Sequence, residues 1–465
     1  MPDSPLASGP AGPTHLRPLL DTVLTALHNG TAARPGPLPA GGPTTVTEHV
    51  RRTLGDPLPE HGTDDEEALA TLVHLLAQGA ADPADPLCAA HLHCPPLAVA
   101  TAADLAASAL NPSMDSWDQA PAASALETLV TDALAGLVHP GLRPAATALV
   151  TTGATEANQL ALLLARETHA PAPVHLVTGA NAHHSLHRAA WLLGLPEPVT
   201  VPTPTGTLDP DTLHTSLAQL PTATVLVAAT AGTTDAGHID PLPDLADVCA
   251  HHGARLHIDA AYGGTLLFSD RRRHLLGGLD RAHTVALDLH KLGWQPVAAG
   301  LLSVRDPAEA RATLAHHADY LNADDDTHAG FPDLLDRSLR TTRRPDIFKI
   351  ATTLRALGRT GIGALVDQVC DLAAAFARTI DSHPRFELYA RPHLSTVLFR
   401  PQHISDPALA HLRRELLTGG HAVLGRAHVD GRLWLKATLL NPHIRPSDLT
   451  ALLNLVEGHT SRSSR

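Results

Sequence analysis

The chain has 465 residues, with 44% hydrophobic residues, 17% charged residues and a formal net charge of −13 at pH 7. This length predicts two or three structural units around a sizeable core, and the composition is typical of a soluble globular protein. The negative charge argues against a nucleic-acid partner, because binding phosphates requires a basic surface. No stretch is long and apolar enough to predict a membrane span.

The cysteines and histidines give information about compartment and metals. The four cysteines form no CxxC pair, and the N-terminus lacks the basic and apolar regions of a signal peptide. We therefore expect reduced thiols and a cytoplasmic location. The 32 histidines are scattered along the chain, as in the pairs His91/His93 and His251/His252. Because metal ligands need defined spacings, we predict no metal site.

The first 90 residues are expected to form a helical segment. An apolar stripe predicts one helix over residues 16–27, with Gly30 beyond its end, and a second helix over 65–78. A Pro/Gly-rich linker at 33–43 separates them. Both helices are apolar enough to need a partner surface, either the main domain or a second subunit.

From about residue 140 the pattern changes to strands that alternate with helices. This alternation predicts an α/β domain with a largely parallel sheet, in which ligands bind beyond the carboxyl ends of the strands. The expected helices cover 156–166, 185–193 and 242–251. The expected strands cover 148–151, 174–177, 225–229, 255–258, 284–287 and 300–304.

The last hundred residues have a different pattern. Runs at 422–429 and 432–440 flank Asp430-Gly431, a pair that favours a β-hairpin turn, and helical patterns cover 362–381 and 406–417. They indicate a separate small α+β domain. We therefore predict three parts: an N-terminal helical segment (1–90), a large α/β domain (91–345) and a small C-terminal α+β domain (346–465).

Two segments at strand ends carry groups that suit a phosphorylated cofactor. Residues 151–158, Thr-Thr-Gly-Ala-Thr-Glu-Ala-Asn, follow a strand and open a helix, whose N-terminus offers positive partial charge to a phosphate. Alone, such small residues more often form only a tight turn. Asp259 ends a strand in His-Ile-Asp-Ala-Ala-Tyr-Gly-Gly, where a carboxylate can pair with a protonated pyridine nitrogen. Alone, Asp259 would be interpreted as a helix cap or metal ligand.

Two further segments complete an ordered set. Lys291 follows an apolar strand in Leu-Asp-Leu-His-Lys-Leu-Gly, where its amine can condense with an aldehyde. A lysine at a strand end is ordinarily a solvated charge, but the residues around this one are too apolar for that interpretation. His183, in Ala-His-His-Ser after the strand at 174–177, can stack on a planar ring, although an isolated histidine would more often be structural.

The ordered set of phosphate turn, histidine, acid and lysine resembles the group II pyridoxal-phosphate (PLP) amino-acid decarboxylases of fold type I. Members of this family act on glutamate, aromatic amino acids, histidine and 2,4-diaminobutyrate. The resemblance runs from about His91 to Pro442 and includes further segments at 111–112, 116–121, 231–237, 239–242, 338–344 and 439–442. It implies a PLP-dependent transferase-like α/β fold, PLP as cofactor, and decarboxylation of an L-amino acid to an amine and carbon dioxide.

The family's catalytic roles carry over to matching positions. By resemblance, Lys291 binds the PLP aldehyde as a Schiff base, and Asp259 pairs with the pyridine nitrogen. His183 stacks on the ring, with Ala261 on the opposite face. We choose His183 over His184 because the family's histidine stands two positions before a serine.

The remaining contacts follow from the same resemblance. Either Thr233 or Thr234 contacts cofactor or substrate, and the sequence leaves this choice open. Tyr320 matches the family's mobile-loop tyrosine, which protonates the substrate carbon after carbon dioxide leaves. The residues expected to hold the phosphate are Gly153, Ala154, Thr155 and His290.

Several alternatives remain for the reaction and the substrate. The Leu-Gly-Trp-Gln-Pro-Val segment after Lys291 is closest to the diaminobutyrate branch of the family. Fold type I also supports transamination, aldol cleavage and decarboxylation-dependent oxidative deamination, and Tyr320 favours simple decarboxylation over oxidative chemistry. A non-enzymatic PLP-fold protein would not need Lys291, Asp259 and His183 together. The family also implies a homodimer with its active site at the subunit interface and its N-terminal helices wrapped around the partner.

Overall fold

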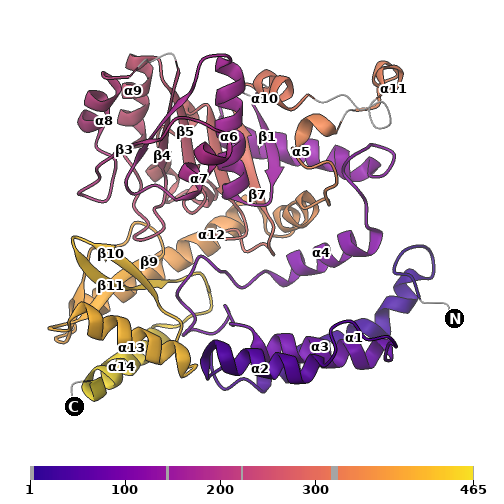
Figure 1. The fold of residues 1–465 in the computed structure, drawn as a ribbon, viewed down its shortest axis with the longest axis vertical. Coiled ribbons are helices and arrows are strands. Elements are labelled where there is room, and N and C mark those ends of the chain that lie inside the picture. Colours follow the sequence, from indigo (N-terminus) through magenta and orange to yellow (C-terminus); the bar gives the residue numbers. More distant parts are fainter. Residues whose placement is uncertain (1–4, 143–145, 221–223, 316–322, 333, 464–465) are drawn as a thin grey trace. The chain divides into compact units, whose positions relative to one another are not determined.

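The computed structural model describes the chain except for residues 1–4, 143–145, 221–223, 316–322, 333 and 464–465 (Figure 1). Its contacts divide the chain into two compact units. The larger unit contains Pro96–Asp371 and Pro392–Ser395, and the smaller unit contains Met1–Pro95, Leu372–Arg391 and Thr396–Arg465. These units follow spatial contacts rather than chain order, so the predicted domain limits at residues 90 and 345 stay a prediction.

The larger unit is built on a seven-stranded sheet in the order β1-β7-β6-β5-β4-β2-β3. The strands from β3 to β6 in this order are parallel, whereas β7 is antiparallel to both β6 and β1. The α/β prediction with a largely parallel sheet is confirmed. The strands are β1 (Thr147–Thr151), β2 (His175–Gly179), β3 (Val199–Val201), β4 (Val225–Thr230), β5 (Arg255–Ala260), β6 (Thr284–Asp288) and β7 (Gly300–Val304).

Helices pack around this sheet and connect its strands (Figure 1). The α-helices are α4 (Ala98–Leu110), α5 (Pro121–Val138), α6 (Ala154–His169), α7 (Ser185–Leu192), α8 (Pro210–Leu217), α9 (Leu242–His252), α10 (Pro307–Leu314), α11 (Asp324–His328) and the first part of α12 (Ile347–Asp381). Short 3₁₀ helices are η2 (Gly264–Phe268), η3 (Arg273–Leu276), η4 (Leu279–Arg281) and η5 (Leu335–Arg337).

Helix α6 has a central place in the packing of the larger unit. Its Leu160 and Leu164 belong to the apolar cluster formed with β1, β6 and β7, and Leu162 belongs to the cluster formed with β2 and β4. Each of these leucines is at most 1% exposed, and burying such a side chain stabilises a fold by about 1.5–3 kcal/mol. This packing fixes the helix N-terminus beyond the end of β1.

The smaller unit combines an antiparallel sheet with helices. Its sheet has the order β10-β11-β9-β8, and a core of buried residues from this sheet, α13, α14 and the end of α12 holds it together. The elements are α1 (Gly12–Ala32), α2 (Gly42–Leu54), α3 (Asp65–Gly79), β8 (Phe386–Leu388), β9 (Thr396–Pro401), α13 (Asp406–Thr418), β10 (Gly425–Val429), β11 (Arg432–Thr438) and α14 (Pro446–Ser463).

Two glycines in the smaller unit, Gly431 and Gly30, allow backbone arrangements that a larger residue would disturb. The predicted hairpin is present, and Asp430 and Gly431 have φ angles of 53° and 69°, as a type I′ turn requires. Gly30 does not lie beyond the end of the first helix, because α1 continues to Ala32. A Cβ atom at Gly30 would lie 2.5 Å from the backbone oxygen of His74. Gly30 therefore permits close contact between α1 and α3.

Helix α12 corrects the prediction that no stretch could span a membrane. By length and composition alone it passes that test, with a mean hydropathy of 1.3 over 18 residues. The sequence pattern predicted a helix only over 362–381, whereas the observed helix starts at Ile347 and is interrupted at Gly358, whose φ is 67°. Of that apolar window, 44% is buried inside the protein, and core helices of globular proteins pass the same test of length and composition.

Candidate active site

The predicted site residues of the larger unit follow the ends of its strands. Gly153 comes after β1, His183 after β2, and Thr233 after β4, while Asp259 lies near the end of β5 and Lys291 after β6. The parallel strands β2, β4, β5 and β6 direct their carboxyl ends to one edge of the sheet. Strand β1 is antiparallel to β7, which is antiparallel to β6, so β1 ends at the same edge.

Lys291 is the lysine best suited to react with an aldehyde. The chain has three lysines, Lys291, Lys349 and Lys436. The side chain of Lys349 is 1% exposed and pairs with two carboxylates, and Lys436 is 9% exposed on β11. The side chain of Lys291 is 20% exposed. Its amine is therefore both positioned by the fold and reachable by a small molecule.

Asp288 holds Lys291 beside the predicted phosphate turn. Its Oδ2 lies 2.9 Å from Lys291 Nζ, and its Oδ1 accepts a 2.8 Å hydrogen bond from the backbone N–H of Ala154. The same carboxylate lies 3.6 Å from His290 Nε2. One buried side chain thus connects the lysine, the histidine and the first residue of α6.

The turn before α6 has no room for a larger residue. A Cβ atom at Gly153 would lie 3.2 Å from Cε1 of His290, and one at Gly300 would lie 2.4 Å from the Gly153 Cα. Glycine at both positions allows β7, the turn and His290 to approach closely. The helix N-terminus that follows offers the partial positive charge that a phosphate prefers.

Asp259 is a buried acceptor with neutral hydrogen-bond donors. It is 4% exposed; its Oδ2 accepts a 2.9 Å hydrogen bond from Asn158 Nδ2, and its Oδ1 accepts one of 3.1 Å from the Ala261 N–H. A carboxylate held in this way can accept a further hydrogen bond from a pyridine N–H and favour its protonated form. Ala261, half-buried, follows it with a methyl side chain.

A chain of hydrogen bonds connects Asp259 to His183. Besides binding Asp259, Asn158 Nδ2 donates a 2.9 Å hydrogen bond to Ser185 Oγ. Ser185 Oγ lies 2.8 Å from Nδ1 of His183, which also accepts from the Ser185 N–H at 3.3 Å. Nδ1 of His183 is therefore an acceptor, and the ring carries its proton on Nε2. Burial lowers the pKa of His183, which favours this neutral form.

His257 supports the network from the opposite side of Asn158. Its Nε2–H donates a 2.9 Å hydrogen bond to Asn158 Oδ1, and its Nδ1 lies 2.9 Å from the hydroxyl of Thr284. Burial lowers the pKa of His257 to about 4, so the ring is neutral at pH 7 and the hydroxyl donates to Nδ1. Each polar atom of the Asn158 amide thereby has a partner, which fixes its orientation.

These contacts also involve residues that were not predicted as site residues, among them Asn158, His257 and Asp288. All three stand inside segments already noted for their chemistry. Asn158 lies one helical turn after Ala154, and an amide on the inward face of an apolar helix is a usable signal for a buried polar contact. Asp288 stands at the end of a buried strand, and His257 stands within one. A polar group without a hydrogen-bond partner would be costly at such positions.

The other predicted residues differ in their surroundings. Thr233 is buried, and its Oγ1 accepts a 3.0 Å hydrogen bond from the His238 N–H, whereas Thr234 is exposed. Thr155 is exposed at the start of α6. Tyr320 lies outside the described residues. Burial lowers the pKa of His290, so this ring is neutral at pH 7 and can donate a hydrogen bond from one nitrogen.

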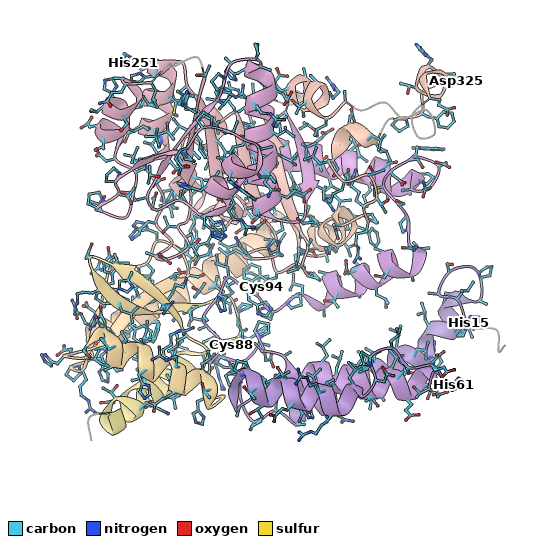
Figure 2. The ribbon with its side chains drawn as sticks, viewed as in Figure 1. His15, His61, Cys88, Cys94, His251 and Asp325 are labelled. Atoms are coloured by element: carbon cyan, nitrogen blue, oxygen red, sulfur yellow. The ribbon has the colours of Figure 1, made fainter. Side chains whose placement is uncertain are left out.

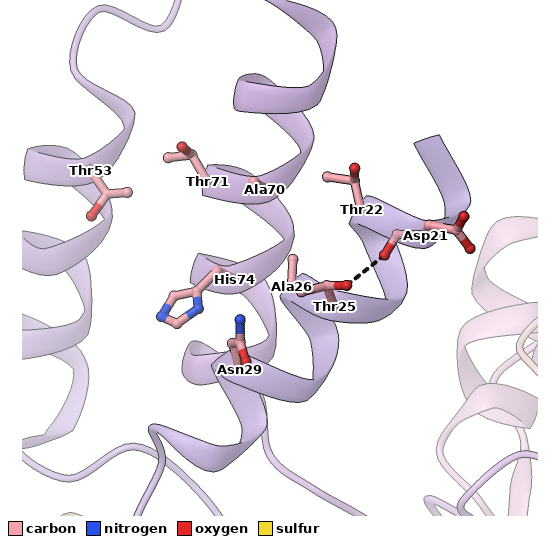
Figure 3. A pocket seen from close by; sticks show the side chains of 9 residues that line it. All are labelled: Asp21, Thr22, Thr25, Ala26, Asn29, Thr53, Ala70, Thr71 and His74. Carbon is pink, nitrogen blue, oxygen red and sulfur yellow. Dashed lines mark hydrogen bonds between the residues drawn. The ribbon is translucent and has the colours of Figure 1, made fainter. Parts of the chain in front are cut away.

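A cavity of about 590 Å³ in the smaller unit contains none of the predicted site residues (Figure 3). Thr53 of α2, Thr71 and His74 of α3, and Thr22 and Asn29 of α1 line it. It has no lysine, and two of its threonines donate to their own helix: Thr22 to the Pro18 carbonyl at 3.2 Å and Thr25 to the Asp21 carbonyl at 2.8 Å. This cavity is therefore not the candidate active site.

The donor set at the sheet edge fits PLP. An accessible amine suits the aldehyde, a buried carboxylate suits the pyridine nitrogen, and a neutral imidazole and a methyl group suit the two faces of the ring. The turn before α6 is crowded, and glycine at this position brings the backbone close to the place where a phosphate would bind. No second lysine among the described residues has the exposure of Lys291.

Comparison with known proteins gives the same assignment. A family model described as the pyridoxal-dependent decarboxylase conserved domain matches residues 48–402. The L-2,4-diaminobutyrate decarboxylase of Rhizobium meliloti (strain 1021) is 40% identical over 422 residues, which cover 88% of this chain and 84% of that protein. The enzyme of the same name from Acinetobacter baumannii is 31% identical over 87% of this chain and 85% of its own.

Solved structures agree in fold. The glutamate decarboxylase domain of a Vibrio parahaemolyticus diaminobutyrate-pyruvate transaminase and L-2,4-diaminobutyrate decarboxylase superposes with a TM-score of 0.87 at 30% identity, over 98% of both chains. The predicted fold class, the PLP cofactor and the amino-acid decarboxylase activity are confirmed by these matches. The chain belongs to the pyridoxal-dependent decarboxylase family.

Proposed function

We propose that the chain decarboxylates L-2,4-diaminobutyrate to carbon dioxide and the corresponding diamine. The observation that carries this proposal is the 40% identity to the Rhizobium meliloti diaminobutyrate decarboxylase over 88% of the chain. The segment after Lys291 favours the same branch. Relatives described as acidic amino acid decarboxylases are less similar, at 26–30% identity.

The geometry supports specific roles for the site residues. We assign Lys291 to the PLP aldehyde, Asp259 to the pyridine nitrogen, and His183 and Ala261 to the two faces of the ring. The turn from Gly153 to Thr155 and His290 would hold the phosphate, and the buried Thr233 is a better candidate for a cofactor contact than the exposed Thr234.

Each residue of the site would have its own role in the decarboxylation. When bound, PLP accepts the electrons of the broken bond between Cα and the carboxylate. Asp259, held by Asn158 and Ala261, would accept a hydrogen bond from the pyridine N–H and favour the protonated nitrogen. Lys291 would hold the cofactor through its aldehyde between turnovers. We assign Tyr320 as the donor of the proton that replaces the carboxylate.

We also propose a homodimer in the cytoplasm. The helices α1 to α3 carry large apolar side chains on their surface: Leu24, Leu27, Leu54, Leu72 and Leu76 are 41–70% exposed. Such a surface is unusual on a monomer and suits burial against a second copy. All four cysteines are free, as expected in a reducing compartment.

Borohydride reduction tests the assignment of Lys291, because it makes the bond between PLP and its lysine permanent. With three lysines in the chain, peptide mass spectrometry gives an unambiguous position. We expect the label on Lys291 and its loss in Lys291→Ala, while Lys436→Met keeps it. A label on Lys349 or Lys436 would overturn the assignment.

A substrate panel tests the reaction. Purified holoenzyme is given L-2,4-diaminobutyrate, ornithine, glutamate, aspartate and aromatic amino acids, and carbon dioxide and amine are measured. We expect the highest kcat/KM for L-2,4-diaminobutyrate, with equal yields of carbon dioxide and diamine. Faster turnover of an acidic or aromatic amino acid would refute the substrate, and carbonyl products with ammonia would indicate oxidative deamination.

A further inference from the structure

His214 and the adjacent pair His251 and His252 meet on the surface of the larger unit. His214 lies in the last turn of α8, and His251 and His252 lie in the last turn of α9. These two helices lie side by side in Figure 1, and Figure 2 labels His251 at the end of α9. The three side chains offer nitrogen atoms that all lie within 4.8 Å of one another.

The distances between these nitrogens suit one metal ion. Zinc binds histidine at about 2.0–2.1 Å in a tetrahedron, which puts ligand nitrogens about 3.3 Å apart. Nε2 of His252 lies 3.0 Å from Nδ1 of His214. The ring centroids are 4.7 Å apart for His214 and His252, and 5.3 Å apart for His214 and His251. The spacing of His214 and His252 is within a few tenths of an ångström of this value, and the His251 nitrogen, within 4.8 Å of both, would have to move by at most about 1.5 Å to reach the same ion.

The electrostatic environment also favours a cation. All three histidines stand at helix C-termini, where the carbonyl groups leave a negative partial charge. Two such ends converge here.

We propose that His214, His251 and His252 form a binding site for a divalent transition metal, with Zn²⁺ as the ion that best suits three imidazoles. Imidazole ligands select zinc, copper and nickel over magnesium and calcium. His214 and His251 are exposed and His252 is half-buried, so water completes the coordination and the ion exchanges with solvent.

The role of this site is structural and separate from decarboxylation. His252 precedes the amino end of β5, whereas Asp259 lies near its carboxyl end. Asp259 is four positions after Arg255 in the strand, which is about 13 Å at 3.3 Å per residue. A bound ion would therefore connect α8 to α9 without touching the residues assigned to PLP. The prediction of no metal site failed to find this cluster because its ligands come from two separate helices.

Zinc binding by the metal-free holoenzyme tests the proposal, measured in competition with a chromophoric chelator. The many other histidines require a matched control, and His61→Asn provides one on the smaller unit (Figure 2). We expect the triple variant H214N/H251N/H252N to hold one equivalent of zinc fewer than the parent. Each single variant should bind that equivalent at least about tenfold more weakly, and H61N should match the parent.

Anomalous diffraction at the zinc edge locates the ion on the unaltered chain, at one equivalent of zinc. A peak between α8 and α9 supports the site, and a peak elsewhere overturns it. Equal zinc binding by the triple variant and the parent also overturns it. Without zinc, the triple variant should keep the decarboxylation rate of the parent, which separates loss of the metal site from loss of the fold.

Discussion

Asn158 offers the sharpest test of how this site is held together. The residue is fully buried, and its amide contacts Asp259, Ser185 and His257 at 2.9 Å each. Replacement by leucine keeps nearly the same branched shape and removes every polar atom. Asn158→Leu therefore isolates the hydrogen bonds from the packing of α6.

The expected loss of stability follows from the groups left behind. His257 Nε2–H and Ser185 Oγ each lose a partner in the interior, and each unsatisfied group costs about 1–3 kcal/mol. Asp259 keeps the N–H of Ala261 but loses its other donor. The two groups together cost about 2–6 kcal/mol, a large share of the roughly 5–15 kcal/mol that keeps a protein folded.

The effect on catalysis is separable from the effect on stability. A hydrogen bond to a charged group is worth about 1.5–3 kcal/mol, and each 1.4 kcal/mol is a factor of ten in rate. If the bond to Asp259 acts mainly in the transition state, kcat of the folded, PLP-loaded variant should fall about tenfold to a hundredfold, with KM changed less. Asn158 is a positioning residue in this account, because it acts through Asp259.

Urea unfolding, stopped assays of carbon dioxide release and the visible spectrum of the cofactor measure these effects. Asn441→Ala is a suitable control, since this buried amide in the smaller unit donates to the Ala84 carbonyl at 2.7 Å. It should lose stability and keep kcat. Parent-like kcat, spectrum and stability in Asn158→Leu would refute the role of the network.

Three further outcomes are expected. Arg343→Met should lower the free energy of unfolding by about 3–5 kcal/mol in urea, because it leaves Glu127, its bidentate partner at 2.6 and 2.7 Å, buried without its main cation; equal stability would contradict this. Burial lowers the pKa of His283 to about 4. Between about pH 6.5 and pH 4 the unfolded chain therefore binds a proton that the folded chain does not, so the free energy of unfolding should fall by up to about 1.4 kcal/mol for each unit by which the pH is lowered. A shallower slope in His283→Gln would identify this residue. Gly153→Val should weaken PLP binding measured by equilibrium dialysis, because its side chain would crowd the His290 ring; unchanged affinity would show that the turn has room.

The sequence predicted the sheet well because buried strands are marked by their own residues. Predicted and observed limits differ by at most two residues for the six strands expected in the larger unit. Strand β3, of three residues, was missed because it is too short to show a pattern. Helices α4 and α5 were also missed, since their many alanines suit a helix without giving a clear apolar stripe.

The sequence predicted the segments that carry the chemistry of the site, but it did not predict the contacts between them. Lys291 and Asp259 stand in recognisable segments, so the sequence indicated their chemistry. The contact between Asn158 and Asp259 joins residues about a hundred positions apart, and only the stacking of α6 on the sheet brings them together. The three-histidine cluster depends in the same way on the packing of α8 against α9.

Asp288 connects two parts of the site that lie in separate sequence motifs. Its two oxygens hold the Lys291 amine and the Ala154 N–H at 2.9 and 2.8 Å, so the lysine and the phosphate turn share one anchor. In the proposed assignment, Lys291 would hold the PLP aldehyde and the turn before α6 its phosphate, so this one carboxylate would position both groups that hold the cofactor. The buried network from Thr284 to His183 fixes the side chain that is proposed to stack on the ring. The packing of α6 on β5 and β6 is thus the structural basis on which the chemistry depends.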